Sequence, residues 1–93
     1  MTLLNKDQVK NLIEEKKLTD WKLSEKEIKR QFTFKDFKGS MAFINKVAAI
    51  AESEGHHPDI YVFFNKVTLK LMTHYANGLT ENDFILAAKI NNI

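Results

Sequence analysis

The chain has 93 residues, of which 44% are hydrophobic and 28% are charged, and its formal net charge is +2 at pH 7. This length suits a single domain over residues 1–93, and the interleaved lysines and acids give direct nucleic-acid binding no support. There is no cysteine, which excludes disulfides and thiolate metal ligands, and no apolar run approaches the roughly 20 residues that span a bilayer. We expect a cytoplasmic protein without membrane contact.

The first expected element is a helix from Asn5 to about Lys16. Asn5 can cap it together with Gln8, and Leu4 can pack against Val9 across the helix start. Two short strands around a turn near residues 24–25 are expected next, because apolar residues there alternate with polar ones. These apolar residues are Trp21, Leu23, Ile28, Phe32 and Phe34.

The longest expected helix runs from Asp36 to about Glu54, and Gly55 is a natural stop. Apolar residues recur along it at helical spacing and are expected to face the core. They are Phe37, Met41, Ile44, Val47, Ala48 and Ala51.

A β-hairpin is expected from residues 59–64 and 67–74, which are rich in β-branched and aromatic side chains. The two residues between these strands, Asn65 and Lys66, are expected to form the turn, because Asn tolerates positive φ. Phe64 would then face Val67, and the ladder would bury the alternate apolar side chains on one face.

This register predicts the positions of the histidines. Extending the ladder to its open end puts His57 across from His74, at the roughly 5 Å between Cβ atoms that is typical of cross-strand neighbours. Pro58 favours an extended His57 and cannot donate a ladder hydrogen bond. We therefore expect His56 and His57 on an exposed rim at the strand entrance.

The last expected helix begins after Thr80, which forms a capping box variant with Asp83. The element order α-β-β-α-β-β-α predicts an α+β fold, with a four-stranded antiparallel sheet and three helices on one face. Tyr61, Phe63 and Met72 are then expected to lie exposed on the other face. An open face with aromatic side chains favours a homo-oligomer.

All three histidines fall between residues 56 and 74. Imidazole can both donate and accept a proton near neutral pH, since its unperturbed pKa is about 6.5. The histidines could be surface or capping residues, ligands of zinc or iron with Glu52 or Asp59 as a carboxylate partner, or general acids and bases. Adjacent histidines on an extended segment point to opposite sides, so we expect no metal site. Nucleophilic catalysis would need a cysteine or a G-x-S-x-G serine, and the chain has neither.

A spaced set of acidic, histidine, proline and aromatic residues resembles the signature of the pterin-4α-carbinolamine dehydratases. The set is Glu52, His56, His57, Pro58, Phe64, His74 and Asp83. The resemblance extends over nearly the whole chain. The chain departs from the family at Gly55, where members often carry an acid, and at Asn82, where some carry an arginine.

The resemblance implies an enzyme that dehydrates 4a-hydroxytetrahydropterin to the quinonoid dihydropterin and so restores the cofactor of aromatic amino acid hydroxylases. Family members use no metal or other cofactor and are typically dimers or tetramers, so we expect a homodimer or homotetramer. The alternative is a non-enzymatic binding module, because some animal relatives act as a dimerisation cofactor of a transcription factor.

The resemblance also implies the site residues. The catalytic residues are expected to be His56, His57 and His74. The substrate-binding residues are expected to be Trp21, Glu52, Pro58 and Asp59. Because His57 and His74 are expected on one sheet face, we expect them to flank the 4a-hydroxyl, with His56 completing proton transfer from the rim.

Overall fold

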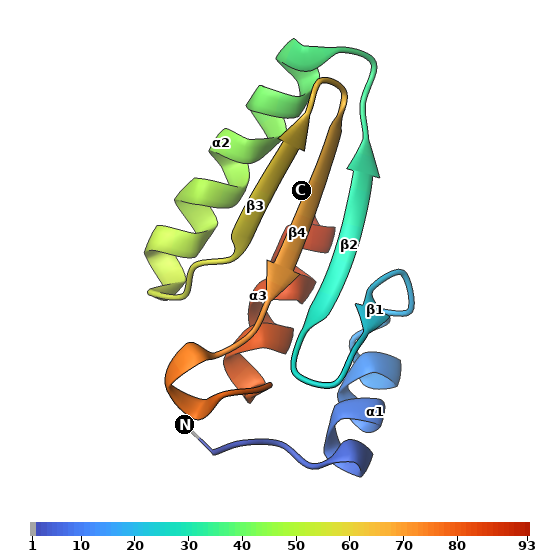
Figure 1. Cartoon of the computed structure of the whole chain (residues 1–93), viewed down its shortest axis with the longest axis vertical. Coiled ribbons are helices and arrows are strands. Elements are labelled where there is room, and N and C mark those ends of the chain that lie inside the picture. The colour runs from blue at the N-terminus through green and yellow to red at the C-terminus, as the bar shows by residue number, and fades with distance from the viewer. Residues whose placement is uncertain (1) are drawn as a thin grey trace.

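The computed structural model describes residues 2–93 and contains one antiparallel sheet with the strand order β1-β2-β4-β3 (Figure 1). The elements, in chain order, are α1 (Lys6–Glu15), β1 (Lys22–Leu23), β2 (Ile28–Thr33), α2 (Phe37–Glu54), β3 (Asp59–Phe63), β4 (Lys66–Leu71), the 3₁₀ helix η1 (His74–Ala76) and α3 (Glu81–Asn91). The predicted α+β class and the order α-β-β-α-β-β-α are confirmed.

Local capping residues define the helix ends as predicted. The backbone N–H of Gln8 donates to the side chain of Asn5 at 2.9 Å, and the Gln8 side chain accepts from the Asn5 backbone at 2.9 Å. Asp36 caps α2 by accepting from the N–H of Gly39 at 2.8 Å. Gly55 ends α2 at φ 64°, a left-handed conformation that costs glycine little.

The core lies between one face of the sheet and the helices (Figure 1). From β4, Val67, Leu69 and Leu71 are fully buried because they alternate along the central strand. From α3, Phe84 and Leu86 are also fully buried, and α1 and α2 contribute to the same cluster. Burial of these branched and aromatic side chains is the main source of stability for a domain of this size.

The face of α2 that meets the core was predicted in part, since Val47 and Ala51 are buried and Ile44 packs against the core. The buried residues are Ser40, Phe43, Val47 and Ala51. Of the predicted face, Phe37 is 51% exposed and Met41 is 37% exposed. Ser40 is buried because its hydroxyl donates to the carbonyl of Phe64 at 2.9 Å, which ties this side of the helix to the hairpin turn.

The β3–β4 hairpin turns at Phe64 and Asn65, so the predicted turn at Asn65 and Lys66 was wrong by one residue. Val62 faces Val67, and Phe64 takes the positive φ of 48°. Asn65 instead uses its side-chain amide to donate to the carbonyl of Phe34 at 3.2 Å. The register changes by two residues, which keeps the paired side chains of β3 and β4 on their predicted faces.

The sheet face opposite the core is partly apolar, as predicted. Tyr61 is 43% exposed and Phe63 is 59% exposed, whereas Met72 is partly buried. None of the helices within residues 2–93 combines the length and the apolarity that crossing a membrane requires.

Candidate active site

The three histidines lie on two connecting segments at the same end of the sheet (Figure 1). One segment joins α2 to β3 and carries His56 and His57. The other joins β4 to α3, carries His74, and is closed by a backbone bridge between Thr73 and Gly78. Hydrogen bonds through Asp83 connect the two segments.

His56 is more enclosed than His57 or His74. The left-handed turn at Gly55 reverses the chain, and the N–H of His56 donates to the carbonyl of Ala51 at 3.1 Å. The His56 side chain is 13% exposed, and its Nε2 lies 2.5 Å from Oδ1 of Asp83. His56 is therefore largely buried, and its predicted position on an exposed rim was wrong.

Asp83 lies in the first turn of α3 and is fully buried. Its Oδ2 accepts from the hydroxyl of Thr73 and from the backbone N–H of Thr80, both at 2.9 Å. With His56 on Oδ1, both carboxylate oxygens are engaged. The position near a helix N-terminus also favours a negative charge.

The contact with Asp83 favours one tautomer of His56 when the carboxylate is ionised. An ionised carboxylate accepts hydrogen bonds and cannot donate them, so the His56 nitrogen that faces Asp83 is Nε2–H. Nδ1 is then the nitrogen that can gain or lose a proton. A histidine held in one tautomer by a carboxylate is the arrangement used for general acid–base catalysis.

His57 has a different environment. Its Nε2 contacts Oε2 of Glu52, in the last turn of α2, and the two side chains are 63% and 76% exposed. The pair is open to solvent, so a substrate can reach it. It contributes little to stability, as is usual for exposed ion pairs.

His74 is exposed and begins η1, whereas the sequence pattern predicts that the hairpin continues to this residue. The ladder ends with Asp59 opposite Lys70, and β4 ends at Leu71. The predicted cross-strand pairing of His57 with His74 was therefore wrong. The chain leaves the sheet because Thr73 pairs with Gly78 and closes a short loop.

The other predicted substrate-binding residues lie in two places. Asp59 begins β3, directly after Pro58 and the two histidines. Trp21 is only 3% exposed and packs in the core, where its indole N–H donates to Asn91 at 2.9 Å. Their roles in binding a substrate stay predictions.

Within residues 2–93, no three histidine, aspartate or glutamate side chains are grouped as they would be to hold one metal ion. Two of the histidines instead pair individually with carboxylates, His56 with Asp83 and His57 with Glu52.

Sequence reasoning did not include Asp83, Thr73 or Thr80 among the site residues. The sequence pattern predicts Asp83 and Thr80 as cap residues of the last helix, and Asp83 also belongs to the family signature. The signature was the available signal for Asp83. The two threonines stand in segments that fall where the family has similar residues, but their contacts with Asp83 depend on the tertiary structure.

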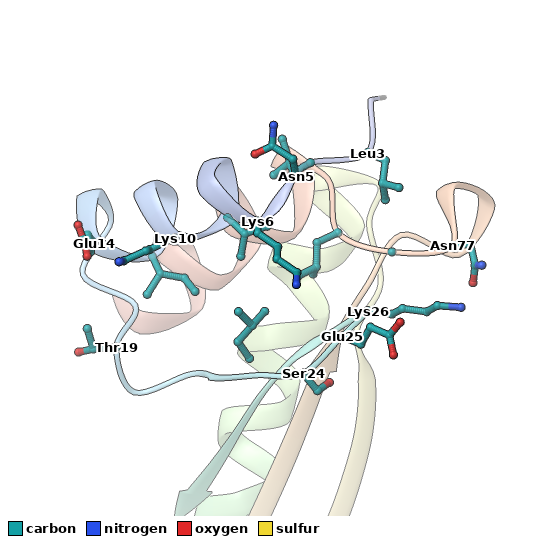
Figure 2. Close-up of a pocket in the computed structure, with 16 residues that line it drawn as sticks. Leu3, Asn5, Lys6, Lys10, Glu14, Thr19, Ser24, Glu25, Lys26 and Asn77 are labelled. Atoms are coloured by element: carbon teal, nitrogen blue, oxygen red, sulfur yellow. The ribbon is translucent and has the colours of Figure 1, made fainter.

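A separate apolar groove of about 890 Å³ lies between the N-terminal segment with α1 and the β1–β2 turn (Figure 2). Its apolar lining is Leu3, Leu4, Val9, Ile13, Leu23 and Leu79. No histidine lines this groove, so it is distinct from the cluster around Asp83.

Comparisons with known proteins identify the family of the chain. The family model described as pterin 4 alpha carbinolamine dehydratase matches residues 2–93. A Legionella pneumophila (strain Corby) protein whose name places it among the pterin-4-alpha-carbinolamine dehydratases is 49% identical over 92 residues, which cover 97% of this chain and 80% of the relative. A relative so named from Acidobacterium capsulatum is 58% identical over 73 residues, or 78% of this chain and 79% of the relative.

Solved structures give the same result. A Brucella melitensis protein described as a transcriptional coactivator/pterin dehydratase superposes with a TM-score of 0.89 at 32% identity, covering 98% of this chain and 97% of the other. A pterin dehydratase-like protein described as a RuBisCO assembly factor superposes with a TM-score of 0.67 at 24% identity, covering 78% of this chain and 87% of the other, and so shares the fold. The sequence match over residues 2–93 and these relatives show that the chain belongs to the pterin-4α-carbinolamine dehydratase family.

Proposed function

We propose that this protein converts 4a-hydroxytetrahydropterin to quinonoid dihydropterin and water, and thereby recycles the pterin cofactor of aromatic amino acid hydroxylases. The observation that carries the proposal is the combination of family membership with a histidine held on a fully buried aspartate, His56 on Asp83. Buried carboxylate–histidine pairs in an accessible site are typical of proton-transfer enzymes.

The reaction needs two proton transfers. The bond from C4a to the hydroxyl oxygen breaks, and that hydroxyl takes a proton and leaves as water. The neighbouring ring nitrogen loses its proton to a base, and its electron pair forms the new double bond to C4a. One protonated and one neutral imidazole near the substrate meet both needs, and the net charge of the substrate is unchanged.

His56, His57 and His74 are the proposed acid–base groups. His56 offers Nδ1 for proton transfer because Asp83 occupies Nε2. His57 is exposed and paired with Glu52, and His74 is exposed on η1. A bound substrate could therefore approach the exposed rings of His57 and His74, and the proposal requires that Nδ1 of His56 also face the substrate.

Substrate binding is proposed for Glu52, Pro58 and Asp59, which flank the two adjacent histidines. Glu52 and Asp59 supply carboxylates that could accept hydrogen bonds from the amino and ring N–H groups of a pterin. Substrate binding by Trp21 stays a prediction, and its indole N–H is bonded to Asn91 at the end of α3 opposite to Asp83.

A homodimer or homotetramer is proposed as the working form. Five large apolar residues are at least partly exposed along α2 and the hairpin: Phe37, Met41, Val62, Phe63 and Phe64. The hydrogen bond between Ser40 and the carbonyl of Phe64 brings α2 and the turn together. Val62 and Phe63 are adjacent in β3 and point to opposite faces, so apolar surface is exposed on both sides of this strand. β3 is also an edge strand, and a second copy could cover both features.

The direct test is the dehydration rate of synthetic 4a-hydroxytetrahydropterin. His56→Ala, His57→Ala and His74→Ala should each lower the enzymatic rate by about 10²–10⁴-fold if each histidine transfers a proton. Lys10→Ala, on an exposed position of α1, is the matched control and should keep the wild-type rate. A wild-type protein that does not accelerate dehydration above the spontaneous rate would refute the proposal and favour a binding module.

A further inference from the structure

Two buried threonine hydroxyls lie behind the His56–Asp83 pair. Thr73 is 1% exposed and Thr80 is fully buried, and their hydroxyl oxygens are 2.7 Å apart. Thr73 has a single hydroxyl proton, and it donates that proton to Oδ2 of Asp83 at 2.9 Å. The hydroxyl of Thr80 must then be the donor to Thr73. The hydrogen bonds form one chain from Thr80 through Thr73 to Asp83.

This chain controls how the carboxylate is oriented. The Thr73 hydroxyl and the Thr80 backbone N–H both bind Oδ2, which leaves Oδ1 directed at His56. Without the two donors, rotation of the carboxylate about its last bond would move Oδ1 away from Nε2. A valine would fill the space of Thr73 equally well. The role of the hydroxyl is therefore to orient the Asp83 carboxylate through its hydrogen bond, and not to fill space.

Thr73 also holds the segment that carries His74. Its backbone N–H donates to the carbonyl of Gly78 at 2.8 Å, and its carbonyl accepts from the N–H of Ala76 at 3.1 Å. His74 is the next residue in the chain. One residue is therefore bonded both to the partner of His56 and to the loop that presents His74.

We propose that Thr73, supported by Thr80, is a positioning residue that orients the carboxylate of Asp83. This orientation keeps His56 in its Nε2–H tautomer and fixes the position of the His56 ring relative to the segment that carries His74. The inference rests on the proposed function for its kinetic consequences. Its structural consequence, the tautomer of His56, can be measured without substrate. Groups that orient a catalytic side chain through hydrogen bonds typically change activity by about 10–100-fold when removed.

The kinetic test compares Thr73→Val with Thr73→Ser. Valine removes the hydroxyl at the same shape and should lower kcat by about 10–100-fold, with KM changed by less than about threefold. Serine retains the hydroxyl and should restore kcat to within about threefold of wild type. In an Asp83→Asn background, Thr73→Val should cause no further loss of kcat, because both act through His56. Equal losses for valine and serine, or additive losses in the double variant, would overturn the inference.

The second test is nitrogen-15 NMR of the imidazole rings. Neutral His56 in the wild-type protein should carry its proton on Nε2, and Thr73→Val should shift it toward a mixture of tautomers. Wild-type His56 with its proton on Nδ1 would overturn the inference even if Thr73→Val does not fold. A wild-type protein without dehydratase activity would refute the proposed function, and the ring tautomers alone would then decide this inference.

Discussion

Replacing Asp83 by asparagine should separate the chemistry of the site from the stability of the fold. The amide oxygen of the new side chain can take the place of Oδ2 and keep the hydrogen bonds from Thr73 and from the backbone of Thr80. The amide NH₂ then occupies the place of Oδ1 and faces Nε2 of His56. Because NH₂ can only donate, neutral His56 must become the Nδ1–H tautomer, and its basic nitrogen then faces the amide and not the substrate.

The magnitudes follow from the same contacts. Asp83→Asn leaves both fully buried donors satisfied, so the free energy of unfolding should fall by less than about 2 kcal/mol. Asp83→Ala leaves the Thr73 hydroxyl and the Thr80 N–H without an acceptor, which costs about 2–6 kcal/mol at about 1–3 kcal/mol each. That loss is large against the roughly 5–15 kcal/mol typical of a domain. Loss of the productive tautomer should lower kcat by about 10²–10⁴-fold in Asp83→Asn.

The measurements are kcat and KM for 4a-hydroxytetrahydropterin, together with urea unfolding of the wild type and both variants. We expect Asp83→Asn to be folded and nearly inactive, and Asp83→Ala to be strongly destabilised. An Asp83→Asn variant that is as stable as expected and retains kcat within about threefold of the wild type would refute the tautomer argument. A folded Asp83→Ala with wild-type stability would refute the burial argument.

Three further predictions concern the metal, the assembly and the core. Exhaustive chelation should leave the dehydratase activity unchanged, and elemental analysis should find no stoichiometric zinc or iron. Activity that disappears with the chelator and returns with one metal would contradict the prediction of a metal-free enzyme. Light scattering of the wild-type protein should report a dimer or a larger species, and Phe63→Thr should shift the protein toward monomer. A wild-type mass of 10.8 kDa at micromolar concentration would disprove the assembly. Leu69→Ala, at a fully buried position of β4, should lower the free energy of unfolding by about 2–5 kcal/mol, which a loss under about 1 kcal/mol in urea unfolding would contradict.

Features that depend on neighbouring residues could be predicted from the sequence. The cap at Asn5 and the stop at Gly55 were both predicted, because their hydrogen bonds and backbone angles involve residues only a few positions away. The alternation of apolar residues along β4 also identified the buried face of the sheet, even though the register was wrong by two residues.

Features that depend on distant residues were harder to predict. The hairpin turn was misplaced because Asn65 bonds to Phe34, far earlier in the chain, and Phe64 takes the positive φ. The face of α2 was predicted only in part for a related reason, since burial of Ser40 depends on the carbonyl of that turn. The pairing of His56 with Asp83 likewise joins two segments whose proximity no local pattern contains.

The strand order has a consequence for how the chain folds. β4 lies between β2 and β3, so the central strand of the sheet is made after both of its neighbours. A nascent chain that ends before residue 66 leaves both of these strands with open edges and has none of the buried side chains of β4. Such intermediates are prone to edge-to-edge association, and non-local pairing of this kind slows folding. The two segments that carry the histidines flank β3 and β4, so recovery of dehydratase activity during refolding should report completion of the whole sheet.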